Sequence, residues 1–281
     1  MESELDVNKI AAAFVQANAE GAWSAITSRV KGARNMVRSK FEGTYRSYLE
    51  RVLGRYSRGK SFFVRSKPVP LYEFFVPLDL ATQRRVLCKP SATEMAAVSR
   101  NSIITGSGGS GKTMMMRHIL ISTIVDRAKT PIFLELRQLN QSEEGVRSAL
   151  LRTLQTNDLD VDDEYLEVAL AAGHFSVMLD GFDELQRSRR KGVAREIQEL
   201  VERYPSNWFV MSSRPIRSLR AGGPSFNSVS SRWTWSGRQN WCRSFRSMTP
   251  FGRSLKLTSG LLCLRGIIRS SQIRSCSPSC F

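Results

Sequence analysis

A glycine-rich octapeptide constrains the fold of this chain more than any other stretch. Its residues are Gly106, Ser107, Gly108, Gly109, Ser110, Gly111, Lys112 and Thr113. They fit the pattern G-x-x-x-x-G-K-S/T, which requires a strand before it and a helix after it. Residues 102–105 predict a short buried strand, and residues 114–121 predict the beginning of a helix. The octapeptide is therefore expected to link a strand to a helix in an α/β fold.

The chemistry of phosphate binding explains why these residue types occur at this spacing. Backbone N–H groups at the beginning of a helix lack intrahelical partners, and the helix dipole adds positive charge there. Glycines allow the backbone to curve around a phosphate at little steric cost. Lys112 is expected to reach the β- and γ-phosphates of a nucleotide, and the Thr113 hydroxyl to bind Mg²⁺. The alternative is a glycine-rich turn that binds nothing.

Strands and helices alternate through the middle of the chain. This alternation predicts a parallel sheet with helices on both faces. The predicted strands lie near residues 100–105, 130–136, 175–180 and 208–213, and the predicted helices near residues 112–126, 143–155 and 193–203.

Charged residues follow the third and fourth predicted strands. Asp180 ends an apolar strand and is expected to hold Mg²⁺ beside Thr113. Asp183 and Glu184 follow, and one of them is expected to orient or deprotonate a hydrolytic water. Arg214 comes after the fourth strand and is expected to sense the γ-phosphate or to stabilise transition-state charge. The alternatives are a common Asp-Gly turn at Asp180 and a surface arginine at Arg214.

The sequence D-G-F-D-E at residues 180–184, together with the octapeptide, resembles the NACHT family of P-loop NTPases, which are signal-transducing ATPases with numerous domains. The resemblance covers about residues 71–219 and includes residues 132–137 and 209–215. It implies ATP binding, exchange with ADP as a conformational switch, slow hydrolysis and nucleotide-dependent oligomerisation, often in innate or anti-phage defence. No readable motif identifies the base, so GTP stays open beside ATP.

Four regions are predicted. Residues 1–65 form an N-terminal helical region, residues 66–98 a connector, residues 99–221 an incomplete NTPase core, and residues 222–281 a basic Ser/Arg-rich tail. Apolar residues in the first region recur at three- and four-residue steps, with interruptions expected at Gly21, Gly32 and Gly43. Its basic face either binds nucleic acid or an acidic membrane, or is a solvated face of helices that pack on a partner domain. Self-association or a protein partner through these helices is also expected.

The last sixty residues differ sharply in composition from the rest. From residue 222 onward there are nine Lys or Arg and no Asp or Glu, within a chain of net charge +17. Regular periodicity is lost, which predicts a disordered or out-of-frame tail. The alternative is a nucleic-acid-binding tail in which Trp233, Trp235 and Trp241 stack on bases. A core that stops before this tail leaves its first strand at the sheet edge. It also lacks the helical lid that the resemblance implies, which exposes one side of the nucleotide to water, so weak nucleotide binding and poor turnover are expected.

Composition also bears on cellular location. There is no run of about 18 apolar residues, so no membrane span is predicted. The acidic N-terminus lacks a secretory pattern, and the five cysteines suit free thiols, so a cytoplasmic location is expected.

The predicted function is a nucleotide-dependent switch with slow hydrolysis. The alternatives are a scaffold that binds nucleotide without cleaving it, and an ATPase that binds nucleic acid through the basic regions.

Overall fold

The fold is described from a computed structural model. The described residues are 6–27, 34–59, 68–75, 78–82, 86–215 and 227–232. Most of the basic tail predicted at residues 222–281 therefore lies outside the described residues, as do Gly32 and the three tryptophans at positions 233, 235 and 241. Within the described residues, no helix is both long enough and apolar enough to span a bilayer.

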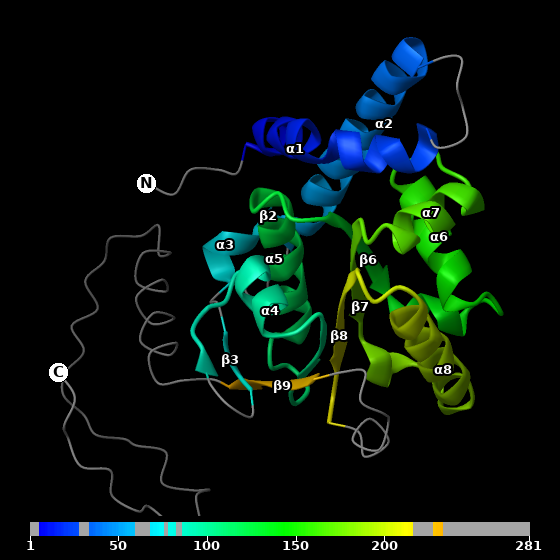
Figure 1. Ribbon diagram of the computed structural model, residues 1–281. Helices are drawn as coiled ribbons and strands as arrows, with labels where there is room; N and C mark the ends of the chain where they lie inside the picture. The colour runs from blue at the N-terminus through cyan, green and yellow to red at the C-terminus, as the bar shows by residue number, and fades with distance from the viewer. Residues whose placement is uncertain are drawn as a thin grey trace, which may run out of the picture.

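A seven-stranded sheet in the order β4-β3-β9-β5-β8-β7-β6 organises the molecule (Figure 1). Its strands are β3 (Asp79–Ala81), β4 (Val86–Leu87), β5 (Asn101–Thr105), β6 (Thr130–Glu135), β7 (Phe175–Asp180), β8 (Trp208–Ser213) and β9 (Asn227–Arg232). The strands from β9 through β5, β8 and β7 to β6 are parallel, whereas β3 is antiparallel to both β9 and β4. The four predicted strands appear as β5, β6, β7 and β8, which confirms the expected parallel α/β sheet.

The first core strand does not lie at a sheet edge, so that expectation was wrong. Strand β9 pairs in parallel with β5, from Ser102 opposite Asn227 to Thr105 opposite Ser230. The sequence of β9 contains a single aliphatic residue, Val229, among serines. Its pattern therefore carries no strand signal, although a sheet ladder needs only backbone groups that can form hydrogen bonds.

Helices cover both faces of the sheet, as the alternation predicts. In Figure 1, α4 and α5 lie on one side of strands β6 to β8, and α6 and α8 lie on the other. The helices of the core are α4 (Ala92–Val98), α5 (Lys112–Val125), α6 (Val146–Thr156), α7 (Asp163–Ala171) and α8 (Arg187–Arg203). Two short 3-10 helices, η1 (Leu136–Asn140) and η2 (Phe182–Glu184), follow β6 and β7.

The two N-terminal helices, α1 (Val7–Thr27) and α2 (Arg34–Tyr56), pack on the core. The buried Tyr48 hydroxyl donates to the carbonyl of Pro131 in the edge strand β6, at 2.5 Å. The Tyr45 hydroxyl lies 2.5 Å from that of Thr130 in the same strand. Burial raises the pKa of both tyrosines well above the ordinary value, so both stay neutral. Helix α2 therefore covers the strand that ends the sheet.

The expected interruptions at Gly21 and Gly43 are wrong, because both glycines lie inside helices. Tertiary packing overrides the weak helix propensity of glycine. A Cβ on Gly21 would lie 3.1 Å from Cε1 of His174, so this glycine permits close packing of α1 on the core.

The predicted connector contains β2 (Val69–Pro70) and α3 (Leu71–Phe74), followed by β3, β4 and α4. Strand β2 pairs with β1 (Arg58–Gly59), directly after α2. Part of the connector thus extends the main sheet, while its first strand joins the end of the N-terminal helices. The boundaries of the four predicted regions stay predictions.

Candidate functional site

The glycine-rich octapeptide forms the loop between β5 and α5. Gly109 and Gly111 have φ values of 72° and 82°, in the left-handed region that favours glycine. Gly111 is the N-cap of α5 and supplies no side-chain cap. The first N–H groups of α5 therefore lack a side-chain partner at the N-cap, which is the arrangement that binds anions.

Lys112 lies within the curve of this loop. Its ammonium group donates to the carbonyls of Gly106 and Ser107, both at 2.9 Å. The Gly106 N–H donates in turn to the carbonyl of Ser213 at the end of β8, at 3.3 Å. The loop is thereby fixed to the neighbouring strand, with the lysine charge on its inner side.

Asp180 ends β7 next to the loop and is 8% exposed. Its Oδ1 accepts a hydrogen bond from the Ser212 hydroxyl at 2.5 Å. Burial raises the pKa of the Asp180 carboxyl, and the hydroxyls of Ser212 and Thr113 partly offset that rise. The structure therefore brings together Thr113 and Asp180, the two residues that the sequence assigns to a metal ion.

Ser212 lies near the end of the fourth predicted strand, and the sequence assigns it no specific role. Its hydroxyl donates to Asp180 and also accepts from the Gly181 N–H at 2.9 Å. Gly181 has φ 79°, so the chain turns sharply directly after the carboxylate. The register between β7 and β8 explains this contact. Leu179 lies opposite Met211, so the next residues of the two strands, Asp180 and Ser212, are neighbours.

The two acidic residues of η2 have different environments. Asp183 is paired with Arg214: its Oδ1 accepts from the Arg214 backbone N–H at 2.8 Å, and its Oδ2 lies 2.9 Å from Nε. Glu184 is exposed and folds back over Gly181, where a Cβ would lie 3.4 Å from Oε1. Among the described residues, Glu184 has no ion pair and its carboxylate accepts no hydrogen bond.

Arg214 lies beside the phosphate loop. A Cβ placed on Gly108 would be 3.5 Å from the Cζ and from one terminal nitrogen of Arg214. The guanidinium group is thus positioned between the loop and Asp183. Arg137, which follows β6, is paired with Glu135, with Nη2 and Oε2 2.6 Å apart.

All the predicted site residues lie at the carboxyl end of the parallel strands, between β5, β7 and β8. This edge of an open α/β sheet is where such folds bind ligands. The residues fit a magnesium nucleotide on their own chemistry, since a hydroxyl and a carboxylate lie together at the helix start and a lysine lies within the loop. The role of each residue stays a prediction.

Comparison with known families agrees with this geometry. Residues 100–230 match the family model described as NACHT domain. The match runs from just before β5 into β9 and includes every predicted site residue. No curated protein matches the chain.

Proposed function

Since the chain carries a NACHT domain of the P-loop NTPase class over residues 100–230, we propose that it binds ATP with Mg²⁺ and hydrolyses it slowly. The bound nucleotide then acts as a switch that controls signalling or assembly. The proposal rests chiefly on one observation, the proximity of Thr113 to the buried Asp180 at the beginning of α5. GTP is the alternative nucleotide, because no base-reading motif distinguishes the two.

The loop and Lys112 are proposed to bind the phosphates. The amides at the beginning of α5 would donate to phosphate oxygens. Lys112 would exchange its two carbonyl partners, Gly106 and Ser107, for phosphate oxygens. Because those carbonyls are weaker partners than an anion, this exchange favours the bound state.

Thr113 and Asp180 are proposed to hold the metal ion. Mg²⁺ at this position would neutralise charge on the β- and γ-phosphates. Ser212 would keep the Asp180 carboxylate oriented through its short hydrogen bond. A cation would also favour the ionised form of Asp180, which burial alone disfavours.

Glu184 is the better candidate for orienting the hydrolytic water. Both oxygens of Asp183 are occupied by Arg214, whereas the carboxylate of Glu184 is exposed and folded over Gly181. A general base needs a free oxygen within reach of the proton that it removes. Asp183 is therefore proposed to position Arg214 near the phosphate loop.

Binding without hydrolysis is a second candidate, and one observation favours it. Arg214, the only arginine that the sequence assigns to the γ-phosphate, has its Nε engaged by Asp183. If this pairing persists when nucleotide binds, the Asp183 carboxylate offsets part of the arginine charge, and transition-state charge would be stabilised less. Single-turnover hydrolysis of radiolabelled ATP distinguishes the two, because a scaffold that binds only would return the ATP uncleaved.

The proposed partners are other protein molecules, including further copies of this chain, in the cytoplasm. Helices α1 and α2 already bury side chains such as Phe14 and Tyr45 against the core. A partner would therefore use the remaining faces of these helices. The size of the assembly with ATP and with ADP, measured by light scattering, tests this part of the proposal.

Native mass spectrometry of the purified protein tests nucleotide binding directly. We expect bound ADP or ATP on the full chain and none on the Lys112→Ala variant, while the Lys191→Ala variant, altered on the exposed face of α8, keeps its nucleotide. Equal occupancy of all three proteins would overturn the proposal.

A further inference from the structure

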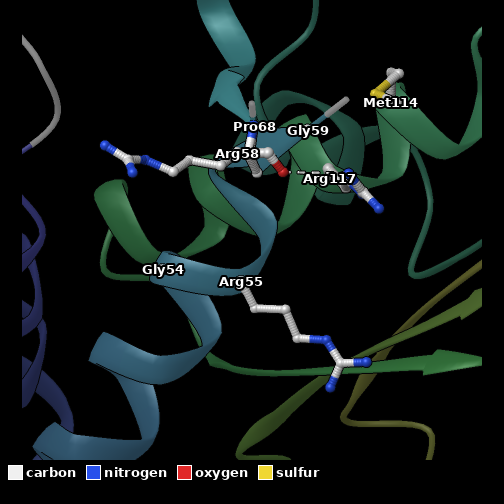
Figure 2. A pocket seen from close by; sticks show the side chains of 7 residues that line it. All are labelled: Gly54, Arg55, Arg58, Gly59, Pro68, Met114 and Arg117. Carbon is white, nitrogen blue, oxygen red and sulfur yellow. Dashed lines mark hydrogen bonds between the residues drawn. The ribbon is translucent and has the colours of Figure 1, made fainter. Parts of the chain in front are cut away.

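A pocket of about 520 Å³ lies between the end of α2 and the first turns of α5 (Figure 2). It is lined by Gly54, Arg55, Arg58, Gly59, Pro68, Met114 and Arg117. Neither the phosphate loop at residues 106–111 nor Asp180 contributes to this lining. The pocket is therefore adjacent to the nucleotide site but built from different residues.

Among the described residues, the lining holds three arginines and no carboxylate, so this part of the pocket is positively charged. The guanidinium carbons of Arg55 and Arg117 lie 5.5 and 5.8 Å from the centroid of the Tyr56 ring. Neither arginine forms an ion pair within the described part of the chain. Both positive charges lie near this ring, and an anion in the pocket would be attracted by both.

Arg117 is held in place but keeps an unused donor. Its Nη1 donates to the carbonyl of Arg58 at 3.4 Å, and a Cβ on Gly59 would lie 3.4 Å from the same nitrogen. Its buried Nε has no hydrogen-bond partner among the described residues. Buried donors are usually satisfied, and such an exception calls for an explanation. A bound anion would supply the missing acceptor.

The side chains are oriented differently around the pocket. Figure 2 shows Arg55 and Arg117 extending toward one side, whereas Arg58 extends toward the opposite side. Arg58 thus contributes charge to the rim without sharing the region of the other two guanidinium groups. This difference provides a matched control.

We propose that the pocket binds a phosphate group of a small phosphorylated molecule through Arg55 and Arg117. The planar guanidinium fork matches the spacing of phosphate oxygens and binds them in pairs. The volume falls within the range of small-molecule sites and exceeds what a phosphate alone would fill. Arg117 lies one helical turn after Thr113, so the site adjoins the predicted metal-binding residue on the same face of α5.

The phosphate has two conceivable sources with the same chemistry. It belongs either to a separate molecule or to the nucleotide on the phosphate loop. Lys112→Ala distinguishes these sources, since this substitution weakens phosphate binding at the loop and leaves the pocket lining unchanged. The proposal itself requires neither hydrolysis nor a particular nucleotide.

Calorimetric titration of the full chain with inorganic pyrophosphate, at constant ionic strength, tests the site. Arg55→Gln combined with Arg117→Gln removes both charges and keeps most of the side-chain volume. We expect this double variant to lower pyrophosphate affinity at least about tenfold. We expect Arg58→Gln to change that affinity less than about twofold. Thermal unfolding of each variant establishes that the fold is retained.

The Lys112→Ala background assigns the source. Binding that survives Lys112→Ala and is then lost with the Arg55 and Arg117 substitutions indicates a separate phosphorylated molecule. Binding that is lost in the Lys112→Ala variant and also in the variant with both arginines replaced indicates that the phosphate belongs to the nucleotide on the loop. An unchanged affinity in the double variant overturns the proposal, as does an equal loss in Arg58→Gln, or the absence of millimolar binding to the full chain.

Discussion

Asp183 binds Arg214 at two points, through the arginine backbone N–H at 2.8 Å and through Nε at 2.9 Å. The carboxylate side chain is 13% exposed, whereas the arginine side chain is 64% exposed. The guanidinium group also lies against Gly108 of the phosphate loop. Asp183 therefore connects η2 to the residue that follows β8 and holds the arginine charge beside the phosphate loop.

Asp183→Asn and Arg214→Gln are expected to affect hydrolysis through one shared mechanism. Each should lower the single-turnover rate by about tenfold to a hundredfold, because each removes or misplaces one charged group near the transition state. The double variant should be no slower than the slower single variant. Rates measured with radiolabelled ATP check this cycle. If the two losses multiply, Asp183 acts independently of Arg214.

Glu184→Gln is expected to slow hydrolysis by about a hundredfold while nucleotide affinity is retained, since it removes only the carboxylate that we propose acts on the water. Single-turnover hydrolysis rates and ADP affinity, measured on the same variant, separate an effect on hydrolysis from an effect on nucleotide binding. Glu199→Gln on the exposed face of α8 is the control, because within the described residues Glu199 pairs only with Arg195, at 3.6 Å. A Glu184→Gln variant with an unchanged rate would assign the water to another residue.

Local chemistry made much of the fold predictable. The phosphate loop is visible because glycines, a lysine and a threonine occur at fixed spacing, and the strands are visible because their cores are apolar. The proximity of Thr113 and Asp180 follows from the topology, because carboxyl ends of parallel strands meet at one edge. The strand that pairs with β5 at Ser102–Thr105 could not be predicted, since its stability comes from backbone pairing with two distant strands.

Long-range packing could not be predicted either. The contact of Tyr48 with Pro131 joins positions 83 residues apart, and nothing in the local pattern specifies it. The double role of Ser212 depends on strand register, which the sequence leaves open. The pairing of Asp183 with Arg214 likewise joins residues 31 positions apart. This last contact engages both oxygens of Asp183, whereas the carboxylate of Glu184 has no partner among the described residues.

Ser212→Ala and Ser176→Ala make the same change in neighbouring buried strands, with opposite expectations. The Ser212 hydroxyl serves both Asp180 and the Gly181 N–H, so its removal should destabilise the fold by about 1–3 kcal/mol. The buried Ser176 hydroxyl has no hydrogen-bond partner in the described residues, so Ser176→Ala should be neutral or slightly stabilising. Urea unfolding compares the two. Equal losses would contradict the role assigned to Ser212.

Glu167→Gln should lower stability at neutral pH but not in acid. The hydrogen bond from the Tyr204 hydroxyl, at 2.6 Å, and the charges of Arg203 and Arg147 lower the pKa of the Glu167 carboxyl below 4.5. The unfolded state then takes up the proton first as pH falls. The stabilisation is therefore complete above pH 4.5 and is lost as pH falls through the folded-state pKa.

Because Glu167 is about one-third exposed, we expect a loss of only about 0.5–1 kcal/mol at pH 7, screened further by salt. Chemical unfolding at several pH values, compared with wild type, gives the difference. It should diminish toward zero below the folded-state pKa. A difference that is constant with pH would mean that Glu167 stabilises the fold by packing and not by charge.

Truncation on either side of β9 tests whether this strand completes the sheet. A chain that ends after Arg232 keeps β9 between β5 and β3, whereas a chain that ends after Ala221 removes it. Removal leaves the backbone groups of β5 unpaired on one side and separates β3 and β4 from the parallel strands.

Several ladder hydrogen bonds are lost, so we expect the shorter chain to be at least about 3 kcal/mol less stable. It should also aggregate through its exposed edge, as unpaired strands do. Thermal unfolding and light scattering of both truncations measure these effects, and equal stability and solubility would mean that the sheet ends at β5.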